Sequence, residues 1–247
     1  MKISIITCVL NNSKFIKNSL TSFKNQTYKN KEHIVIDGGS TDGTIQIIKK
    51  FKNKNLFFFL NSDKGIYKAL NEGIKLSSGN IVGILHSDDF YKNNKILSFI
   101  IKTFQKTGAD IIYGDLLYLT RKKPHKILRY WKAGKFVEKK LSNGWMPPHP
   151  TVFVKKNIFY KIGKYNTKYK ISSDYDFLLR AMKVKGLKKV YIPKVLVNMR
   201  IGGKSNKSLK NIINKSKEDY KIIKRNKVGG LTTLLSKNLS KINQFLR

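Results

Sequence analysis

Residues 81–89 read Ile-Val-Gly-Ile-Leu-His-Ser-Asp-Asp, an apolar run that ends abruptly on two adjacent carboxylates. The run from Ile81 to Leu85 has the length of a strand buried inside a parallel sheet, where helices cover both faces. Asp88 and Asp89 then follow at the carboxyl end of that strand, where open α/β sheets bind ligands. Such carboxylates suit a divalent cation bound together with a phosphate-bearing substrate. A simple Asp-Asp turn that caps the following helix is the alternative.

Strand and helix patterns alternate at close spacing through the first hundred residues. Short apolar runs predict strands at 3–10, 33–36, 56–60 and 81–85. Apolar residues recur at helical spacing between these strands, and the marked positions are Ile16, Leu20 and Phe23, then Ile45, Ile48 and Phe51, then Ile66, Ala69, Leu70 and Ile74. This order predicts an α/β fold with a mostly parallel central sheet that helices flank on both faces.

The second half of the chain has a different pattern. Residues 111–119 predict a strand with Asp115 at a bulge or turn. Residues 174–184 predict a helix, and a short strand is expected near 190–192. Residues 121–146 are basic, aromatic and weakly periodic, which suggests a long excursion over the edge of the sheet.

The C-terminal part of the chain is polar and basic, with two helical stretches separated by Gly229 and Gly230. We therefore expect a main domain at 1–205 and a basic amphipathic helical extension at 206–247. The extension can lie on an anionic membrane surface, or it can pack back on the main domain as an ordinary helix. Its amphipathic pattern consists of Leu231, Leu234, Leu235, Leu239, Ile242 and Phe245, with Lys237, Lys241 and Arg247 between them.

The chain of 247 residues is strongly basic, with 51 Lys and Arg against 14 Asp and Glu and a formal net charge of +37. Nucleic acid, an anionic membrane surface and a phosphorylated substrate are the partners that such charge suggests. Lysine is scattered over the whole chain, however, and arginine, the usual residue for bidentate phosphate contacts, is rare. We therefore interpret most of the charge as a solvated surface and expect no nucleic-acid partner.

Cysteine content and the N-terminal residues bear on the cellular compartment. Cys8 is the single cysteine, which excludes a disulfide framework within the chain and a zinc site built from cysteines. Met1 leads directly into the first expected strand, unlike a signal peptide, and no apolar stretch approaches the roughly 18 residues of a membrane span. We expect a cytoplasmic protein that can also attach peripherally to the inner face of the plasma membrane.

Acidic residues follow three successive strands of the expected sheet. Asp37 opens the segment 37–44, Asp-Gly-Gly-Ser-Thr-Asp-Gly-Thr, whose glycines permit a tight turn and close approach of the backbone to a ligand. This segment lacks the spacing of a dinucleotide fold and of a P-loop. Asp63 follows the third strand, and Asp88 and Asp89 follow the fourth. Because the carboxyl ends of parallel strands meet at one edge, these carboxylates predict a site there.

Several motifs, taken in order, resemble the family 2 glycosyltransferases of the GT-A fold. The resemblance is closest to the bacterial branch that builds capsules, O-antigens and exopolysaccharides, and it covers about residues 1–205. Each motif is weak alone, whereas their order and spacing together are specific. The motifs lie at 7–11, 36–43, 63–71, 86–89, 149–150, 173–176 and 200–205.

The resemblance implies a nucleotide-diphosphate sugar as donor and assigns residues to it. Asp37 would contact the nucleotide base, and Asp63 and Lys64 would approach the nucleotide. Asp88 would reach the ribose or the sugar. The segment that lines the same pocket includes Thr7, Val9 and Asn11.

The resemblance also implies Mn²⁺ or Mg²⁺ bridging the donor diphosphate, with Asp89 as a ligand and Asp88 beside it. A metal is useful there because departure of a nucleoside diphosphate develops negative charge on phosphate oxygens. His149, with prolines on both sides, can face the phosphates or the metal, or can simply hold a rigid turn. Arg200 can hold the leaving diphosphate, or merely end a strand.

Asp174 lies where the family carries its catalytic base, which takes a proton from the acceptor hydroxyl as it attacks the anomeric carbon. Attack from the face opposite the leaving group inverts configuration. Asp176 is two residues away and is the alternative base. The chain departs from the family pattern at Ser173, where many relatives carry Glu, and in the absence of a proline from the first strand. The acceptors expected by resemblance are glycan or polyprenyl-diphosphate-linked precursors of a cell-surface polymer.

Two other functions compete with sugar transfer. A nucleotidyltransferase that forms nucleotide sugars uses a similar sheet and metal, but it needs a loop rich in glycine and containing arginine after the first strand. Residues 7–14 contain neither. A nucleic-acid-binding protein is suggested by the net charge alone, and it would bind with a steep dependence on salt concentration.

Overall fold

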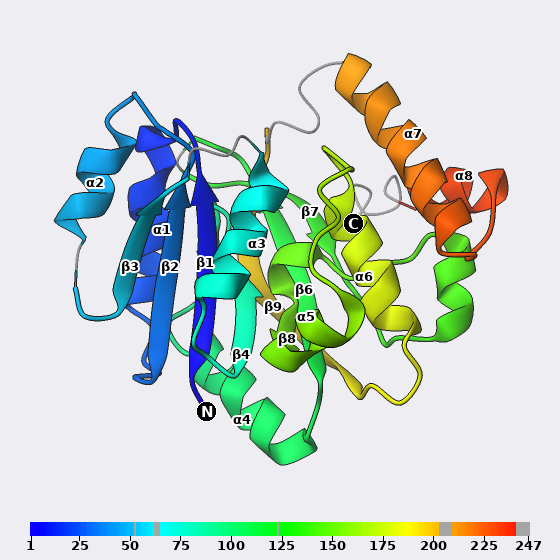
Figure 1. Cartoon of the computed structure of the whole chain (residues 1–247), viewed down its shortest axis with the longest axis horizontal. Coiled ribbons are helices and arrows are strands. Elements are labelled where there is room, and N and C mark those ends of the chain that lie inside the picture. Colours follow the sequence, from blue (N-terminus) through cyan, green and yellow to red (C-terminus); the bar gives the residue numbers. More distant parts are fainter. Residues whose placement is uncertain (52, 62–64, 123, 203–208, 241–247) are drawn as a thin grey trace.

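The computed structural model describes residues 1–51, 53–61, 65–122, 124–202 and 209–240. The alternation of strands and helices expected at the N-terminus is present, and Figure 1 shows the resulting sheet between layers of helices. β1 pairs in parallel with β2 and β4, and β2 pairs in parallel with β3. These elements are β1 (Ile3–Val9), α1 (Ser13–Lys24), β2 (Lys31–Asp37), α2 (Thr44–Lys50), β3 (Leu56–Leu60), α3 (Ile66–Leu76) and β4 (Ile81–Ile84).

The rest of the chain extends this sheet beyond β4. The strand order is β3-β2-β1-β4-β8-β6-β9-β5, and β7 pairs with β6. β8 lies antiparallel between β4 and β6, whereas β9 is parallel to β6. The elements are β5 (Phe90–Tyr91), α4 (Ile96–Thr107), β6 (Ile111–Leu119), β7 (Ile127–Trp131), η1 (Glu138–Asn143), η2 (His149–Thr151), β8 (Phe153–Lys155), α5 (Lys156–Ile162), α6 (Ser173–Lys183), β9 (Lys189–Arg200), α7 (Leu209–Arg225) and α8 (Leu231–Leu239).

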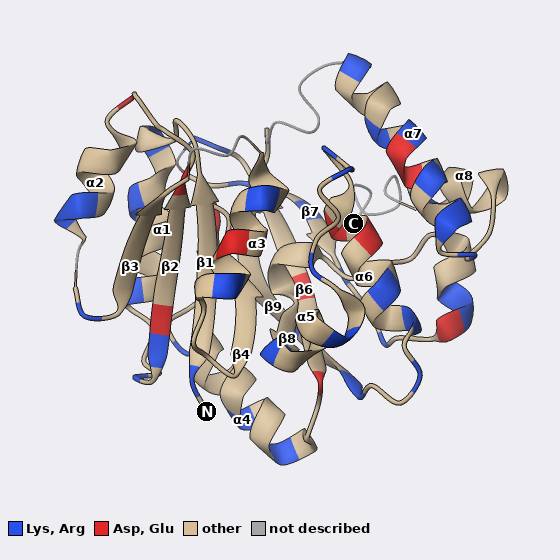
Figure 2. Cartoon of the chain, in the orientation of Figure 1, with Lys and Arg blue, Asp and Glu red and all other residues tan. Residues whose placement is uncertain are grey.

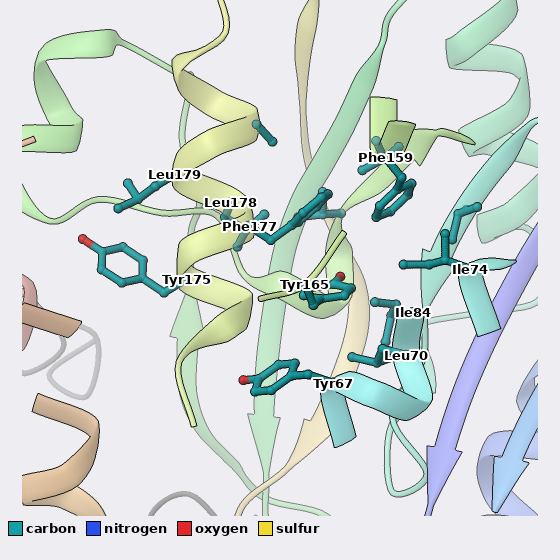
Figure 3. Close-up of a cluster of buried hydrophobic side chains, with 14 of the residues drawn as sticks. Tyr67, Leu70, Ile74, Ile84, Phe159, Tyr165, Tyr175, Phe177, Leu178 and Leu179 are labelled. Atoms are coloured by element: carbon teal, nitrogen blue, oxygen red, sulfur yellow. The ribbon is translucent and has the colours of Figure 1, made fainter. Parts of the chain in front are cut away.

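Packing on both faces of the sheet explains why the strands are continuous apolar runs. One core cluster lies between the sheet and helices that include α3, α5 and α6, and another packs α4 against the opposite face. Figure 3 shows part of the first cluster. Gly83 in β4 is required by this packing, because a Cβ atom there would lie 2.7 Å from the ring of Phe153 in β8.

The bulge expected at Asp115 is confirmed, since the register between β6 and β9 shifts on both sides of it. Its buried carboxylate accepts hydrogen bonds from the hydroxyls of Tyr130 and Tyr191 and from the backbone N–H of Ala133. The excursion expected over residues 121–146 contains a short strand, β7, which pairs antiparallel with β6. Exposed positions break the apolar alternation in β7, and Arg129 instead packs against the rings of Tyr118 and Trp131.

The short strand expected at 190–192 is much longer in the structure, where β9 runs to Arg200 and pairs with both β6 and β5. Pro193 and Lys194 in the middle of β9 are exposed, and they interrupt the apolar pattern after its first residues. Because β9 extends this far, Arg200 lies at its carboxyl end, beside Asp88.

The C-terminal helices α7 and α8 pack against one another, and they contact α6 and η1. Within the described residues, no helix is both long enough and apolar enough to cross a bilayer. Figure 2 shows Lys and Arg distributed over helices and loops throughout the visible face, with no single stripe. The division into residues 1–205 and 206–247 stays a prediction.

Candidate active site

The carboxyl ends of β1, β2 and β4 form the edge at which the sequence predicted a site. The register pairs Val9 with Asp37, so β1 and β2 end at the same level. Both strand ends continue into turns that are bonded to one another. The N–H of Asn11 donates to the hydroxyl of Ser40 at 2.8 Å, and the side-chain oxygen of Asn11 accepts from the N–H of Thr41 at 2.8 Å. Asn11 has a positive φ of 51°, a conformation that asparagine tolerates well.

Asp37 is fully buried, and its carboxylate organises its own turn. One oxygen accepts from the N–H groups of Gly39 and Ser40 at 2.9 and 2.7 Å, and the other accepts from the Ser40 hydroxyl at 2.7 Å. Gly39 has φ of +90°, which other residues rarely adopt. Asp37 therefore sets the shape of the turn that follows β2.

Thr7 and Val9 are both buried in the sheet. The hydroxyl of Thr7 donates to the carbonyl of Leu85 at 2.6 Å and lies 2.8 Å from Nε2 of His33. The carbonyl of Val9 accepts from the N–H of Gly38 at 2.9 Å. The interactions of Thr7 and Val9 thus hold the strand ends together beneath the turns.

Asp88 forms an ion pair that the sequence did not predict. Its carboxylate lies 3.2 Å from the guanidinium of Arg121, and its side chain is 20% exposed. Arg121 also donates to the carbonyls of Ile201 and Gly202 at 2.6 and 3.0 Å. A rare arginine directly after the 111–119 strand was the available signal, but its partner lies 33 residues earlier in the chain.

Arg200 lies beneath Asp88 and is almost fully buried. Its guanidinium donates to the backbone carbonyl of Asp88 and lies between the rings of Phe15 and Phe90, at 5.2 and 4.7 Å from their centres. Burial lowers the pKa of Arg200, and the charges of Asp88 and Asp89 oppose that shift. Arg200 also lines a cavity of about 610 Å³ between α1 and the segment that follows β5.

The carboxylate of Asp89 is completely buried, and neither of its oxygens has a hydrogen-bond partner among the described residues. Burial raises the pKa of Asp89 well above its usual range, and the charge of Asp88 adds to that effect. Buried polar atoms normally have partners, so these two oxygens are acceptors that a ligand can use.

Two histidines continue the site from β4 toward α6. The rings of His86 and His149 lie 5.8 Å apart, and Nε2 of His149 lies 2.8 Å from the hydroxyl of Tyr165. Burial lowers the pKa of His149 to about 4, so its imidazole is neutral near pH 7. Burial also lowers the pKa of His86, against the charges of Asp88 and Asp174. His86 belongs to the motif at 86–89, but the sequence analysis predicted no role for it.

Asp174 lies in the first turn of α6, next to Tyr67 of α3. The Tyr67 hydroxyl donates to the carbonyl of Ile171 at 2.6 Å and lies 3.2 Å from Oδ1 of Asp174. Burial and the charge of Asp174 raise the pKa of Tyr67 well above its usual value, so this hydroxyl stays protonated. Figure 3 shows Tyr67 and Tyr165 between α3 and α6, and their rings stack with centres 5.8 Å apart.

Asp176 is buried and has different partners. One oxygen forms an ion pair with Arg180 at 2.9 Å, and the other accepts from the side-chain amide of Asn226 at 3.3 Å. Residues two positions apart on a helix do not share a face. The structure therefore joins Asp176 to α7 and joins Asp174 to Tyr67 and the histidines.

Two predicted donor residues, Asp63 and Lys64, lie outside the described residues. In the part of the chain that the structure describes, no group of three or more His, Cys, Asp or Glu side chains could hold a metal ion. Among the described carboxylates that follow the parallel strands, Asp88 and Asp89 are adjacent, whereas the Asp37 carboxylate is bonded within its own turn.

Comparisons with known proteins agree with this geometry. The family model for glycosyl transferase family 2 matches residues 4–190. A PGL/p-HBAD biosynthesis glycosyltransferase of Mycobacterium bovis is 28% identical over 208 residues, which cover 82% of this chain and 78% of that protein. An uncharacterized glycosyltransferase of Rickettsia typhi is 29% identical over 205 residues, which cover 81% of this chain and 64% of that protein.

Solved structures show the same fold. S. aureus TarS 1–349 superposes with a TM-score of 0.72 at 19% identity, covering 97% of this chain and 72% of that one. A mannosyltransferase from Pyrobaculum calidifontis, solved with GDP-Man and Mn²⁺, superposes with a TM-score of 0.68 at 16% identity, covering 96% and 68%. The family match spans β1 to the start of β9, including the segment from His86 to Asp89 and Asp174. The chain therefore belongs to glycosyl transferase family 2, with the GT-A fold, and is a glycosyltransferase.

Proposed function

We propose that this glycosyltransferase moves a sugar from a nucleotide-diphosphate sugar to a hydroxyl group of a cell-surface glycan precursor, with inversion at the anomeric carbon. The observation that carries the proposal is the placement of the carboxylates of Asp88 and Asp174 near His86, with Asp89 next to Asp88. Asp88 and Asp89 follow β4 on one side, and Asp174 opens α6 on the other. A donor diphosphate needs a cation, which carboxylates can hold, and an acceptor hydroxyl needs a base, which a carboxylate can be.

The donor fits the edge formed by β1, β2 and β4. TarS has been solved with UDP-GlcNAc, at a TM-score of 0.70 and 18% identity over 92% of this chain and 65% of that one, which supports a nucleotide-sugar donor. Asp37 fixes the turn beside Asn11, and in the proposal this turn holds the nucleotide base. Arg200 and Arg121 bring two positive charges to the same edge, where they would face the diphosphate.

A divalent cation fits the residues present at the end of β4. The oxygens of Asp89 are buried acceptors with no partner among the described residues, and the carboxylate of Asp88 is partly exposed beside them. Oxygen ligands of this kind are what Mn²⁺ and Mg²⁺ prefer. Asp88 and Asp89 would hold the cation, and the neutral imidazole of His149 lies 5.8 Å from the ring of His86, two residues before Asp88. When bound, the cation would neutralise the charge that develops on the leaving diphosphate.

Asp174 is the base in this proposal. Its Oδ1 lies 3.2 Å from the hydroxyl of Tyr67, and its side chain is partly exposed in the first turn of α6. Asp174 would accept the proton of the acceptor hydroxyl as the new glycosidic bond forms on the face opposite the leaving group. Asp176 is unsuited to this role because Arg180 and Asn226 already occupy both of its oxygens.

The exposed face of α8 supports an acceptor carried on a lipid. Leu231, Leu235 and Leu239 recur every four residues, and they are 61%, 54% and 60% exposed. Thr233 and Lys237 of the same helix are buried, so α8 packs by one face and presents leucines on the other. An apolar stripe on a strongly basic protein suits the surface of an anionic membrane, where a polyprenyl-diphosphate-linked acceptor would be found.

A panel of nucleotide sugars with Mn²⁺ tests the proposed donor and metal. We expect one nucleotide sugar to raise the melting temperature and to support release of a nucleoside diphosphate when the acceptor is present. Asp89→Ala should fold and should lose the release that depends on the divalent cation. Glu138→Gln, which changes an exposed carboxylate on η1, is the control. Full activity of Asp89→Ala in the presence of a chelator would contradict the metal assignment.

A further inference from the structure

The segment before α6 lacks a cap of its own. Ser172 is the residue before the helix, and its side chain makes no capping hydrogen bond. The hydroxyl groups of Ser172 and Ser173 are both buried, and neither has a hydrogen-bond partner among the described residues. Because the first N–H groups of a helix have no partner within it, something else has to hold this end.

Glu218 of α7 binds the backbone of the segment that leads into this helix. Its Oε1 accepts from the N–H of Lys170 at 2.8 Å, and its Oε2 accepts from the N–H groups of Ile171 and Ser172 at 2.9 and 2.8 Å. A carboxylate that receives several N–H groups at a helix N-terminus forms charge-assisted bonds and also interacts well with the helix dipole. One side chain thus fixes three consecutive peptide groups just before Asp174.

The other side of the same segment is held by Tyr67. The Tyr67 hydroxyl donates to the carbonyl of Ile171, the residue whose N–H donates to Glu218. The same hydroxyl lies 3.2 Å from the Asp174 carboxylate. Residues 170–172 are therefore held between α3 and α7, and Asp174 follows after Ser173.

Further contacts fix α7 and α8 to α6, so that Glu218 is itself held in place. Asp219 forms a buried ion pair with Lys237 of α8, and the Lys237 ammonium lies 3.8 Å from the centre of the Tyr175 ring. Asn226, just after α7, donates to the carboxylate of Asp176. Figure 3 shows Tyr175 pointing away from Tyr67 and Tyr165. One side of α6 therefore contacts Tyr67 of α3, and another side contacts Lys237 of α8.

We propose that Glu218 is a positioning residue for Asp174, and that the C-terminal helices α7 and α8 are thereby part of the catalytic unit. This inference rests on the proposed role of Asp174 as the base. Glu218 makes none of its bonds to Asp174 itself; it sets the backbone from which Asp174 projects. A small displacement of a base from its substrate proton lowers the rate of the chemical step without a change in donor binding.

Glu218→Gln tests the inference in the full-length enzyme. The amide keeps one acceptor oxygen but turns an NH₂ group toward a backbone N–H, so at least one of the three bonds is lost. We expect kcat to fall by about tenfold to a hundredfold, with an unchanged donor KM and a melting temperature near that of the wild type. Hydrogen exchange of the amides at 170–172 should become faster. Glu138→Gln, the same chemical change at an exposed position of η1, should leave all four measurements unaltered.

A wild-type kcat in Glu218→Gln, together with faster exchange at 170–172, would overturn the inference, because the segment would then be loosened without consequence for the chemistry. If Glu218→Gln does not fold, Glu218→Asp keeps the charge on a shorter side chain and should show a smaller loss of kcat. Asp174→Asn separates the two proposals. If Asp174→Asn abolishes transfer while both Glu218 variants retain it, only the positioning role is wrong. If Asp174→Asn retains transfer, the proposed base is wrong as well.

Discussion

Single residues at the end of β4 have contrasting surroundings, although they are adjacent in sequence. Asp88 is partly exposed and paired with Arg121, whereas Asp89 is buried without a partner in the described part of the chain. The pair Asp88–Arg121 places a guanidinium where the proposed cation would approach. Arg121 would therefore compete with a cation for Oδ2 of Asp88.

Arg121→Ala should tighten binding of Mn²⁺ because the cation no longer competes with the guanidinium. Ion pairs that are partly exposed contribute up to about 1 kcal/mol, so the expected change in Kd is at most about fivefold. Isothermal titration with Mn²⁺ alone measures it, and Lys122→Ala, at an exposed neighbouring position, is the control. Unchanged or weaker Mn²⁺ binding in Arg121→Ala would show that Asp88 is not a ligand.

At the residue scale, the sequence led to Asp37, Asp88, Asp89 and Asp174, because carboxylates at strand ends and in ordered motifs are local signals. It did not lead to Arg121, Tyr67 or Glu218. The partners of these three lie between 33 and 107 residues away in the chain, and their contacts arise only when the helices pack on the sheet. Nothing in the local pattern of Glu218 distinguishes it from a solvated helix residue.

Among the elements, the parallel strands share a hydrogen-bonded cluster in their interior. His33 of β2 is buried beside Thr7 of β1, and the Thr7 hydroxyl donates to the carbonyl of Leu85 after β4. The His33 ring also packs on Phe23 of α1, at 4.3 Å between ring centres. This cluster joins three strands directly below the proposed donor site.

Acidification should destabilise the fold through His33. Burial lowers the pKa of His33 to about 3 from its usual 6.5, with a smaller effect of the charge of Lys31. The unfolded chain therefore binds a proton near pH 6.5 that the folded chain binds only near pH 3, so the stabilisation from the neutral ring is present above pH 6.5 and is lost as pH falls. Within this window the contribution of His33 to the slope approaches about 1.4 kcal/mol per pH unit.

Urea unfolding at several pH values measures this dependence. His33→Gln should unfold with a shallower pH dependence between about pH 6 and 4. His125→Gln, which changes a histidine on the turn before β7, is the matched control. An equal slope in His33→Gln and the wild type would contradict the assignment.

The α8 helix offers a second prediction at this scale. Leu235→Glu places a charge in the middle of the exposed leucine stripe and should reduce sedimentation with anionic phosphatidylglycerol vesicles, because burial of an exposed leucine contributes about 1.5–3 kcal/mol. Leu60→Glu, at an exposed leucine of β3 that lies outside the stripe, is the control. Equal sedimentation of the two variants would show that α8 does not bind the membrane.

Over the whole molecule, the predicted α/β fold is confirmed, but the order of the sheet could not be read from the sequence. The three residues Phe153–Lys155 insert as β8 between β4 and β6, and a strand this short has no detectable period. The two expected C-terminal helical stretches are present, and the structure shows α8 packed on η1 and α7. Periodicity showed that α8 is amphipathic, but only the packing showed which face is buried.

Asp174, the base in the proposed reaction, lies in the first turn of α6. Asp174 contacts Tyr67, stands near two neutral histidines, and is held through the segment that Glu218 fixes. Asp176 is its matched comparison, two residues along the same helix and paired with Arg180.

The most direct measurement is the rate of nucleoside diphosphate release by Asp174→Asn and Asp176→Asn, with a polyprenyl-diphosphate-linked acceptor and the donor found in the panel. Asp174→Asn should bind the donor as the wild type does and should lose a factor of about 10²–10⁴ in rate, the usual contribution of a general base. Asp176→Asn should melt at a lower temperature and retain transfer. Transfer at the wild-type rate by Asp174→Asn, or its loss in a stably folded Asp176→Asn, would contradict the account.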